Sequence, residues 1–409
     1  MSDRTPGPDD TPAATGTPTD GAGSAPRPLE GVRVLDLSRV LSGPFAGRML
    51  ADLGADVVKV EPPEGDMTRT WGREIAGRPG YYFQQNAGKR NVCVDLKSEG
   101  GPELVAALAD EADVLIENFR PGVLARFGLG WEDLSASNPR LVMLSITGFG
   151  QDGPEADRQA YAPVIHAEAG IIGRQASHDG DSPSDLMLSV ADTNASLHGL
   201  VGLLAALYLR QRTGLGQHVD IAMLDTMLAT DDYLHHTLDD FLPEKRLGGY
   251  CYDAAGGPIL VSAQPPHVWR QISSTFGLAD PTPEGADTET KIRCRTEAIE
   301  GWIAAHTDRD VLKADFTRAN LAWADVRNAD TVMSSPTVKH RNMAAEVDDG
   351  NGGSRLVVNS PYRYSAATAG VRGPAPRRGE HNLEVLSHWL GLGPGDVERL
   401  SASGVLACE

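Results

Sequence analysis

The residue best suited to chemistry in this sequence is Asp192, which stands where an apolar run ends and a helical pattern begins. The run 186–190 gives way to small and polar residues, and from Leu197 apolar residues recur at helical spacing as far as Tyr208. Free backbone N–H groups and the positive end of a helix dipole stabilise an ionised carboxylate at such a position. Asp192 could therefore be a carboxylate nucleophile or a helix N-cap, and the local sequence leaves both interpretations open.

A second set of candidates stands at turns beside predicted strands. Lys89 precedes one strand, Asn118, Phe119 and Arg120 follow the strand 113–117, and Arg126 lies one helical turn further along. Open α/β sheets bind ligands at the carboxyl ends of their strands. Cations at this edge could hold phosphates, and Phe119 could stack on a purine base. The alternative is a solvated loop in which Phe119 packs inward.

Other catalytic arrangements have no support in the sequence. The histidines His166, His198 and His218 are isolated, and the adjacent pair His235 and His236 would lie on different sides of a helix. All are interpreted as structural, and we expect no metal site. The sequence contains no nucleophile elbow of the G-x-S-x-G type and no P-loop.

These residues must be positioned by alternating strands and helices. The segment 31–61 is typical of a βαβ unit, and alternating apolar strands and helices continue to residue 146. This pattern predicts an α/β fold with an open parallel sheet covered on both faces. Residues 42–47 lack the G-x-G-x-x-G spacing and place Pro44 where a pyrophosphate would approach the backbone, which disfavours NAD.

Composition divides the chain into four parts. We expect a disordered tail at 1–28, a large domain at 29–238, a small α+β domain with linkers at 239–348, and a return segment with two C-terminal helices at 349–409. The predicted strands of the large domain are 31–37, 55–61, 91–96, 113–117, 140–146 and 219–223, and strand 258–262 opens the small one.

The bulk properties restrict partners and compartment. The net charge of −19 disfavours a nucleic-acid backbone or an anionic membrane. The longest apolar stretch, 197–209, is too short and interrupted to span a bilayer. The four cysteines show no paired or metal-like spacing and no secretory signal is present, so the expected location is the cytoplasm.

An ordered set of motifs resembles the family III CoA-transferases (the CaiB/BaiF type), which include formyl-CoA transferase, carnitine CoA-transferase and the α-methylacyl-CoA racemases. The matching segments are LEGVRVLDL at 29–37, LGADVVKVEP at 53–62, GDMTR at 65–69, NAGKR at 86–90, ADVLIENFRPG at 112–122, NPRL at 138–141, SITGFG at 145–150, GLGQHVDIAM at 214–223 and APRRGEHN at 375–382. Together they cover the chain from about 29 to 406.

The resemblance implies a Rossmann-like domain and a smaller domain in an interlocked homodimer. The family's catalytic aspartate falls on Asp192, which implies CoA transfer from an acyl-CoA to a carboxylic acid through a mixed anhydride and an aspartyl-CoA thioester. Coenzyme A is then a substrate, and no cofactor or metal is required. The resemblance also implies CoA-site contacts, matched by position to Lys89, Asn118, Phe119, Arg120, Arg126 and Tyr161.

Departures from the family pattern bear on the reaction. Tyr161 stands where racemases carry a catalytic histidine, and His166 lies five residues later. Formyl-CoA transferase has a glutamine at the position of Leu41, its glycine-rich lid is reduced here to Gly248-Gly249, and Pro62-Pro63 replace a basic CoA contact. The alternatives are a racemase or isomerase, an intramolecular CoA transfer, and a non-catalytic CoA-binding protein. The donor and acceptor acids cannot be read from the sequence.

Overall fold

The computed structural model describes residues 25–239 and 248–409. Most of the predicted disordered tail therefore lies outside the described residues. Residues 25–28 are an exception, because the Arg27 guanidinium donates to the carbonyls of Asp52 and Gly370, both at 3.2 Å. Arg27 is partly buried, whereas Ala25, Pro26 and Pro28 are exposed, and the disordered tail stays a prediction.

The centre of the molecule is a six-stranded sheet with the order β5-β2-β1-β6-β7-β8, and every neighbouring pair is parallel. Its strands are β1 (Arg33–Asp36), β2 (Asp56–Glu61), β5 (Arg90–Cys93), β6 (Val114–Glu117), β7 (Val142–Thr147) and β8 (His218–Ala222). The predicted α/β fold with a parallel sheet is confirmed, and the strand order is that of a doubly wound sheet. The order reverses between β1 and β6, which is where such sheets bind ligands.

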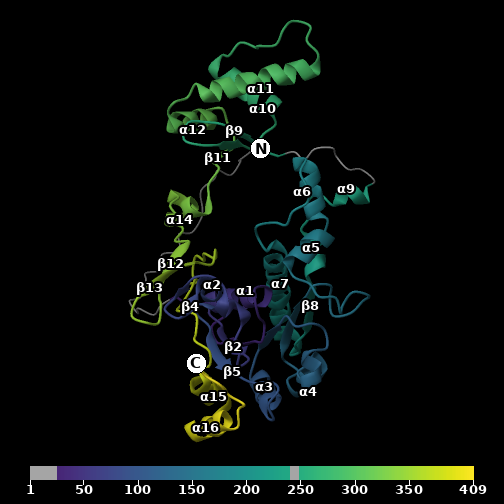
Figure 1. The fold of residues 1–409 in the computed structure, drawn as a ribbon, viewed down its shortest axis with the longest axis vertical. Helices are drawn as coiled ribbons and strands as arrows, with labels where there is room; N and C mark the ends of the chain where they lie inside the picture. The colour runs from purple at the N-terminus through teal and green to yellow at the C-terminus, as the bar shows by residue number, and fades with distance from the viewer. Residues whose placement is uncertain (1–24, 240–247) are drawn as a thin grey trace, which may run out of the picture.

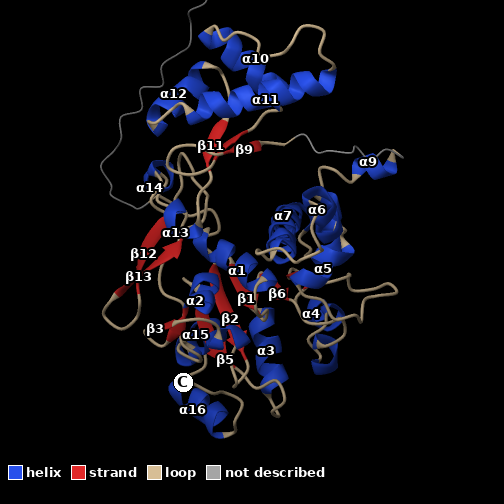
Figure 2. Ribbon diagram, turned by 45° about the horizontal axis from the view of Figure 1, so that its top comes forward, coloured by secondary structure: helices blue, strands red, loops and turns tan. Residues whose placement is uncertain are grey.

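Two layers of helices cover this sheet (Figures 1 and 2). One apolar core joins the sheet to α1 (Ser42–Asp52), α5 (Ala162–Glu168), α7 (Val190–Thr213) and α8 (Met223–Ala229). The core of the opposite face includes α3 (Gly101–Asp110), α4 (Trp131–Ser137) and α15 (Asn382–Leu390), with α16 (Pro394–Ala402) packed against it. Aliphatic residues line both faces of the central strands, as expected for a parallel sheet between helices.

Several short elements were not predicted. They are η1 (Met67–Thr70), β3 (Glu74–Ile75), β4 (Arg78–Pro79), α2 (Gly80–Asn86), α6 (Ile171–Asp179), α9 (His235–Leu238), α13 (Ala329–Val332), α14 (Pro336–His340) and the hairpin strand β12 (Ala344–Asp348), which pairs with β13 (Ser354–Val358). The segment after β6 forms a short 3-10 turn, η2 (Leu124–Phe127). Segments of this length contain too few residues to show a helical or strand period.

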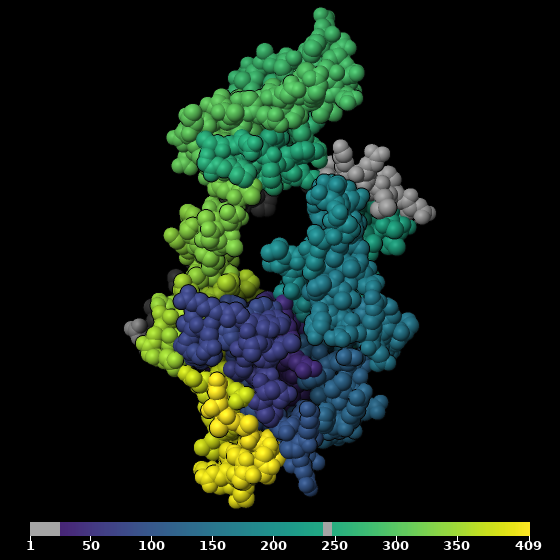
Figure 3. Space-filling view, in the orientation of Figure 1, coloured from purple at the N-terminus to yellow at the C-terminus, as the bar shows by residue number. Residues whose placement is uncertain are grey.

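A second unit lies at the far end of the molecule from α15 and α16 (Figure 1). Its antiparallel sheet has the order β11-β10-β9, built from β9 (Tyr250–Tyr252), β10 (Ile259–Val261) and β11 (Trp323–Asp325). The helices α10 (Pro265–Phe276), α11 (Thr288–Ala304) and α12 (Arg309–Arg318) pack on it around a separate apolar core. Figure 3 shows an opening between helix α6 of the large unit and the segment that carries α14.

Helix α7 is long and apolar enough to cross a membrane by length and composition alone. Its buried residues include Leu200, Leu203 and Leu207, which pack against the central sheet. It is therefore a core helix of the large unit.

Candidate active site

Asp192 lies in the first turn of α7, because the helix begins at Val190. The N-cap is Ser189, whose side chain makes no capping hydrogen bond. The helix-cap interpretation of Asp192 is therefore wrong. The preceding apolar run forms no strand, and Met187 and Leu188 are exposed at 98% and 72%.

Backbone amides from two other helices face the Asp192 carboxylate. The N–H groups of Ser42 and Ala162, together with the Ser42 hydroxyl, lie close enough to the carboxylate to lower its pKa. These residues open α1 and α5, neither of which has a capping side chain, so their amides are free of intrahelical partners. Burial dominates and raises the pKa of Asp192 to about 6, although these donors and His166 act to lower it. The carboxylate is thus mostly ionised at neutral pH and poorly solvated.

His166, predicted to be structural, is fully buried close to Asp192. Its Nδ1 lies 2.8 Å from Asp185 Oδ1, and its Nε2 accepts the backbone N–H of Ala191 at 3.1 Å. Because Nε2 is an acceptor, the ring proton is assigned to Nδ1, which donates to Asp185. The pair thereby binds a free N–H of the first turn of α7, next to Asp192.

The loop 37–41 between β1 and α1 is fixed by buried polar groups. Lys59 Nζ donates to the carbonyl of Ser38 at 2.7 Å, and Asp66 accepts the N–H of Val40 at 3.2 Å. These contacts hold Val40 at φ +70°, a left-handed conformation that a β-branched residue rarely adopts. Gly43 is required here because a Cβ would lie 2.1 Å from that of Ser38. The loop places the start of α1 against Asp192.

Lys89 lies beneath this loop rather than on the surface. Its ammonium binds Asp36 Oδ2 at 2.8 Å and the oxygens of Pro44 and Asn86, both at 2.9 Å. Burial lowers its pKa to about 8, with Lys59 adding to the effect and Asp36 opposing it. All three of its N–H donors are used inside the protein. The structure therefore places Lys89 as a support for the start of α1.

Three arginines line a pocket of about 620 Å³ at the switch point between β1 and β6. Arg39 follows β1, whereas Arg120 and Arg126 follow β6, and both of the latter are exposed. Phe119 lies under the Arg39 guanidinium, with 4.8 Å between guanidinium carbon and ring centroid. The predicted group Phe119, Arg120 and Arg126 is thus brought together at one edge of the sheet. Such a cluster suits a polyphosphate.

Asn118 lies between this arginine pocket and the surroundings of Asp192. Its side chain accepts the N–H of Arg39 at 2.9 Å, donates to the Arg39 carbonyl at 2.8 Å and donates to Ser42 Oγ at 3.1 Å. Ser42 in turn lies close enough to Asp192 to lower the pKa of its carboxylate. Asn118 is therefore placed to organise both sites.

Sequence reasoning missed Arg39 and Tyr81. Arg39 stands three residues after Asp36, at the carboxyl end of a central strand. Because such strand ends bind ligands in open α/β sheets, Arg39 could have been predicted as a site residue. Tyr81 belongs to α2, which was not predicted, and no spacing relates it to Asp192. Burial, followed by the Asp192 carboxylate, raises the pKa of Tyr81 to about 12. Tyr161, the predicted active-site tyrosine, is 52% exposed and precedes the Ala162 amide at the start of α5.

Two other site chemistries find no support. Glu61 ends β2, where a dinucleotide fold presents its ribose-binding acid, but it is buried and bound by Arg69, Tyr82 and Asn91. Within residues 25–239 and 248–409, no group of three or more His, Cys, Asp or Glu could hold a metal ion.

Comparison with known proteins identifies the family. Residues 29–382 match CoA-transferase family III. The chain is 33% identical over 410 residues to succinyl-CoA–D-citramalate CoA-transferase of Chloroflexus aurantiacus, covering 93% of this chain and 98% of the relative. It is 34% identical over 411 residues to formyl-CoA:oxalate CoA-transferase of Streptomyces avermitilis, covering 92% and 99%. A CAIB/BAIF family protein from Brucella suis superimposes with a TM-score of 0.76 at 31% identity, covering 89% of this chain and all of that one. The chain therefore belongs to CoA-transferase family III and is an enzyme of the CoA-transferase type.

Proposed function

We propose that the protein transfers CoA from an acyl-CoA to a carboxylic acid, with Asp192 as the covalent nucleophile. The observation that carries this proposal is the Asp192 carboxylate itself, which is largely desolvated and faces the free amides of two helix starts. Desolvation makes a carboxylate more nucleophilic, and its pKa of about 6 keeps it ionised at pH 7.

The reaction requires four exchanges at carbonyl carbons. An Asp192 oxygen attacks the thioester carbonyl, and CoA thiolate leaves to give a mixed anhydride. The thiolate attacks the Asp192 carbonyl carbon, which releases the first acid as a carboxylate and leaves an aspartyl-CoA thioester. The acceptor carboxylate reverses these two steps and leaves as the new acyl-CoA. Neither the thioester nor the anhydride is hydrolysed, so the reaction needs no ATP.

The surrounding groups have roles that follow from their positions. Attack on the Asp192 carbonyl places negative charge on the oxygen that the amides of Ser42 and Ala162 face, so these amides form an oxyanion hole. Arg39, Arg120 and Arg126 bind the phosphates of CoA, and Phe119 lies beside them. Lys89 supports the start of α1 through Pro44, and Asn118 holds Arg39 in the loop 37–41. We propose that Tyr161, next to the Ala162 amide, contacts the substrate.

Trapping the covalent intermediate tests this mechanism. The enzyme is incubated with succinyl-CoA, quenched and digested, and we expect a CoA-sized mass on the peptide that contains Asp192. Asp192→Ala should yield neither adduct nor transfer. Asp225→Ala is a matched control, because Asp225 is exposed in the first turn of the neighbouring helix α8. Full activity of Asp192→Ala would refute the mechanism. Tight CoA binding by the wild-type protein with no adduct from any acyl-CoA would instead support a non-catalytic CoA-binding role.

A racemase would need a free base beside the α-carbon of the substrate. Both ring nitrogens of His166 are engaged, with Asp185 and with the Ala191 amide, and the ring is fully buried. This arrangement favours the transferase over the racemase. Deuterium incorporation at the α-carbon without an acceptor acid would reverse that preference.

We also propose that two chains form an interlocked homodimer. Helix α7 presents an exposed apolar stripe at helical spacing, made of Leu197, Val201, Leu204 and Tyr208. Exposed apolar surface of this kind is typical of an interface. The opening in Figure 3 lies between α6 and the segment that carries α14, and we propose that a partner chain passes through it. Light scattering should give twice the chain mass, and Val201→Glu should reduce it.

The proposed compartment is the cytoplasm. All four cysteines are free thiols, and Cys251 and Cys408 are exposed. Exposed thiols persist where the surroundings are reducing.

A further inference from the structure

A buried carboxyl group, that of Glu117, has no part in the reaction steps above. Glu117 ends β6, is 4% exposed and stands two residues before Phe119, at the edge of the sheet that carries the arginine pocket. Its Oε2 accepts the backbone N–H of Phe119 at 2.8 Å. This contact fixes the turn by which the chain leaves β6, and Arg120 follows directly in the wall of the pocket.

Glu117 differs from the other deeply buried acids of residues 25–239 and 248–409. Four of these acids are buried at least as deeply, and each has a lysine or arginine nitrogen within 3.2 Å; they are Asp36, Asp52, Glu61 and Asp66. Glu117 has no cationic partner in the same ranges. An unpaired anion is costly inside a protein, so this position favours the neutral acid.

A hydroxyl group and an imidazole continue from Glu117 across the sheet. Ser145 is the direct partner of Glu117 in the register of β6 and β7, and its Oγ lies 2.9 Å from His218 Nε2. The His218 ring stacks on Trp131 of α4, with centroids 5.6 Å apart and an angle of 18° between the planes. Glu117, Ser145 and His218 therefore form a polar row across β6, β7 and β8.

This polar row can hold a proton in two arrangements. When Glu117 is neutral, its O–H can donate to Ser145 Oγ, and the Ser145 hydroxyl can donate to His218 Nε2. When Glu117 is ionised, the Ser145 hydroxyl can turn to donate to the carboxylate and accept from the Nε2–H of His218. The row thus has a satisfied arrangement for each protonation state of Glu117.

Burial dominates the protonation of Glu117. It raises the pKa of this carboxyl group to about 7, against Ser145 and the Phe119 amide, which act to lower it. The Asp220 carboxylate, which is opposite Ser145 on β8, adds a further rise. At neutral pH about half of the molecules therefore carry a proton on Glu117.

The other charged groups near the polar row do not supply the missing cation. Burial lowers the pKa of His218, so its ring is neutral at pH 7. Asp36, at the end of the neighbouring strand β1, is paired with Lys89 at 2.8 Å. Arg120 and Arg126 are exposed and line the pocket. A charge on Glu117 is therefore left uncompensated inside the protein.

We infer that Glu117 is a positioning residue of the arginine pocket and that it acts as a neutral acid. Its Oε2 holds the Phe119 amide, and its proton stays on the polar row while the phosphates of CoA occupy the pocket. Ionisation would add an uncompensated negative charge behind the bound phosphates, so the affinity for CoA should fall as the pH rises through neutrality. This inference rests on the proposed function, because it takes the arginine pocket as the phosphate site of CoA.

Calorimetric titration with CoA between pH 6 and pH 8 tests the inference. CoA and Asp192 also titrate in this range, so the quantity to compare is the Kd of wild type divided by the Kd of Glu117→Gln at each pH. The glutamine cannot ionise, and its amide oxygen can still accept the Phe119 N–H. An acid with a pKa of about 7 is about nine-tenths protonated at pH 6 and about one-tenth protonated at pH 8. The Kd ratio should therefore rise roughly tenfold over this range if the neutral form is the one that binds.

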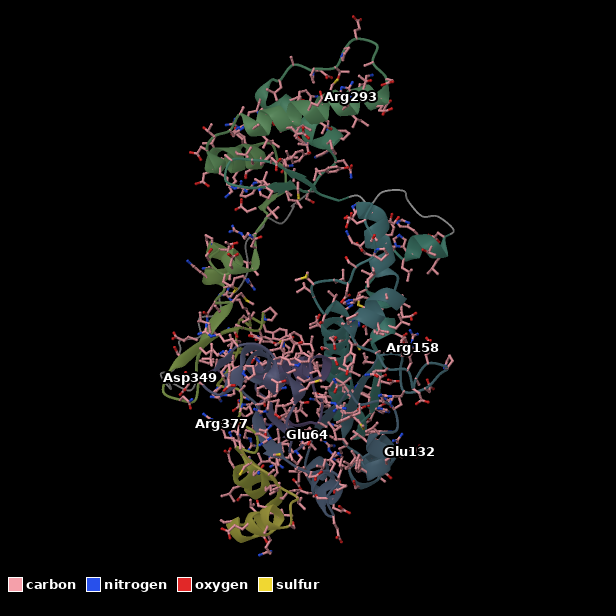
Figure 4. All side chains as sticks on the ribbon, viewed as in Figure 1. Glu64, Glu132, Arg158, Arg293, Asp349 and Arg377 are labelled. Carbon is pink, nitrogen blue, oxygen red and sulfur yellow. The ribbon has the colours of Figure 1, made fainter. Side chains whose placement is uncertain are left out.

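Three further variants separate positioning from folding. Glu117→Leu leaves the Phe119 amide without its acceptor and should raise the KM for acyl-CoA roughly tenfold with little change in kcat. Ser145→Ala should move the rise of the Kd to higher pH, because Ser145 lowers the pKa of Glu117. Glu132→Gln is a matched control and should keep the wild-type profile, since Glu132, labelled in Figure 4, is exposed in the first turn of α4.

The possible results distinguish this inference from the proposed function. A Kd ratio that stays constant from pH 6 to pH 8 would overturn the inference and leave the phosphate site intact. Glu117→Gln binding CoA as poorly as Glu117→Leu at pH 6, or an unshifted profile in Ser145→Ala, would also overturn it. Absence of CoA binding by the wild-type protein at every pH would overturn the proposed function and the inference together.

Discussion

Replacing the nucleophile should make the protein more stable while abolishing transfer. The folded protein binds a proton at Asp192 with a pKa of about 6, first because the group is buried, whereas the unfolded chain binds it with the ordinary value near 4. As pH rises from 4 to 6, the unfolded state therefore loses its proton before the folded state does, and folding becomes less favourable. Asp192→Asn has a neutral group of the same shape and avoids this cost.

The size of the effect follows from the pKa difference. A shift of about two pH units corresponds to roughly 3 kcal/mol of lost stability once both states are ionised. At pH 5 the folded state still holds most of its proton, so the cost there is about half of the value at pH 8. For a chain of this length, 3 kcal/mol corresponds to about 3 °C in Tm.

Thermal unfolding at two pH values measures this difference. Asp192→Asn should melt about 3 °C above wild type at pH 8 and about half as far above it at pH 5. Asp225→Asn replaces an exposed carboxylate in the first turn of α8 and should show little change at either pH. The reasoning would be refuted if Asp192→Asn melted below wild type, or above it by the same margin at both pH values. Either result would show that burial does not destabilise the ionised carboxylate.

Three further outcomes follow from the site. We expect Asp192 to attack in its ionised form. The second-order rate constant for adduct formation from acyl-CoA should therefore rise tenfold per pH unit below about pH 6 and level off above it. A flat pH profile in stopped-flow measurements would contradict this. Arg39→Gln should raise the KM for acyl-CoA by roughly tenfold with little change in kcat, and an unchanged KM in steady-state assays would remove Arg39 from the phosphate site. His166→Ala should lower kcat more than it raises KM, whereas His166→Gln, whose amide oxygen can accept the Ala191 N–H, should recover part of kcat; equal losses in both variants would argue against this contact.

The sequence predicted the parts of the fold that repeat over many residues. The strands β1, β2, β6 and β7 are short apolar runs between polar turns, and α7 shows helical spacing from Leu197 to Tyr208, so each is visible locally. The loop with Phe119, Arg120 and Arg126 could be placed because the carboxyl ends of parallel strands share an edge.

The environment of Asp192 could not be predicted in this way. Its hydrogen-bond donors come from Ser42 and Ala162, which are far from it in the sequence and meet it only when α1, α5 and α7 pack together. For Lys89 the motif was recognised, but the direction of the side chain could not be predicted. Its position in a motif predicts a cation near CoA, but the direction of its side chain depends on Asp36, and the ammonium is directed into the interior.

The position of α15 has a consequence for the order in which the chain folds during synthesis. Val385, Leu386 and Trp389 complete the apolar core on the α3 face of the sheet, and Asp95 donates its N–H to the carbonyl of Val405. Some 300 residues, including the whole second unit, are translated between β5 and these partners. The nascent sheet therefore presents an uncovered apolar face on the ribosome for roughly 15 to 60 seconds at ordinary elongation rates. Chaperone capture during this interval should depend on this face, and removal of residues 383–409 should make the capture persist.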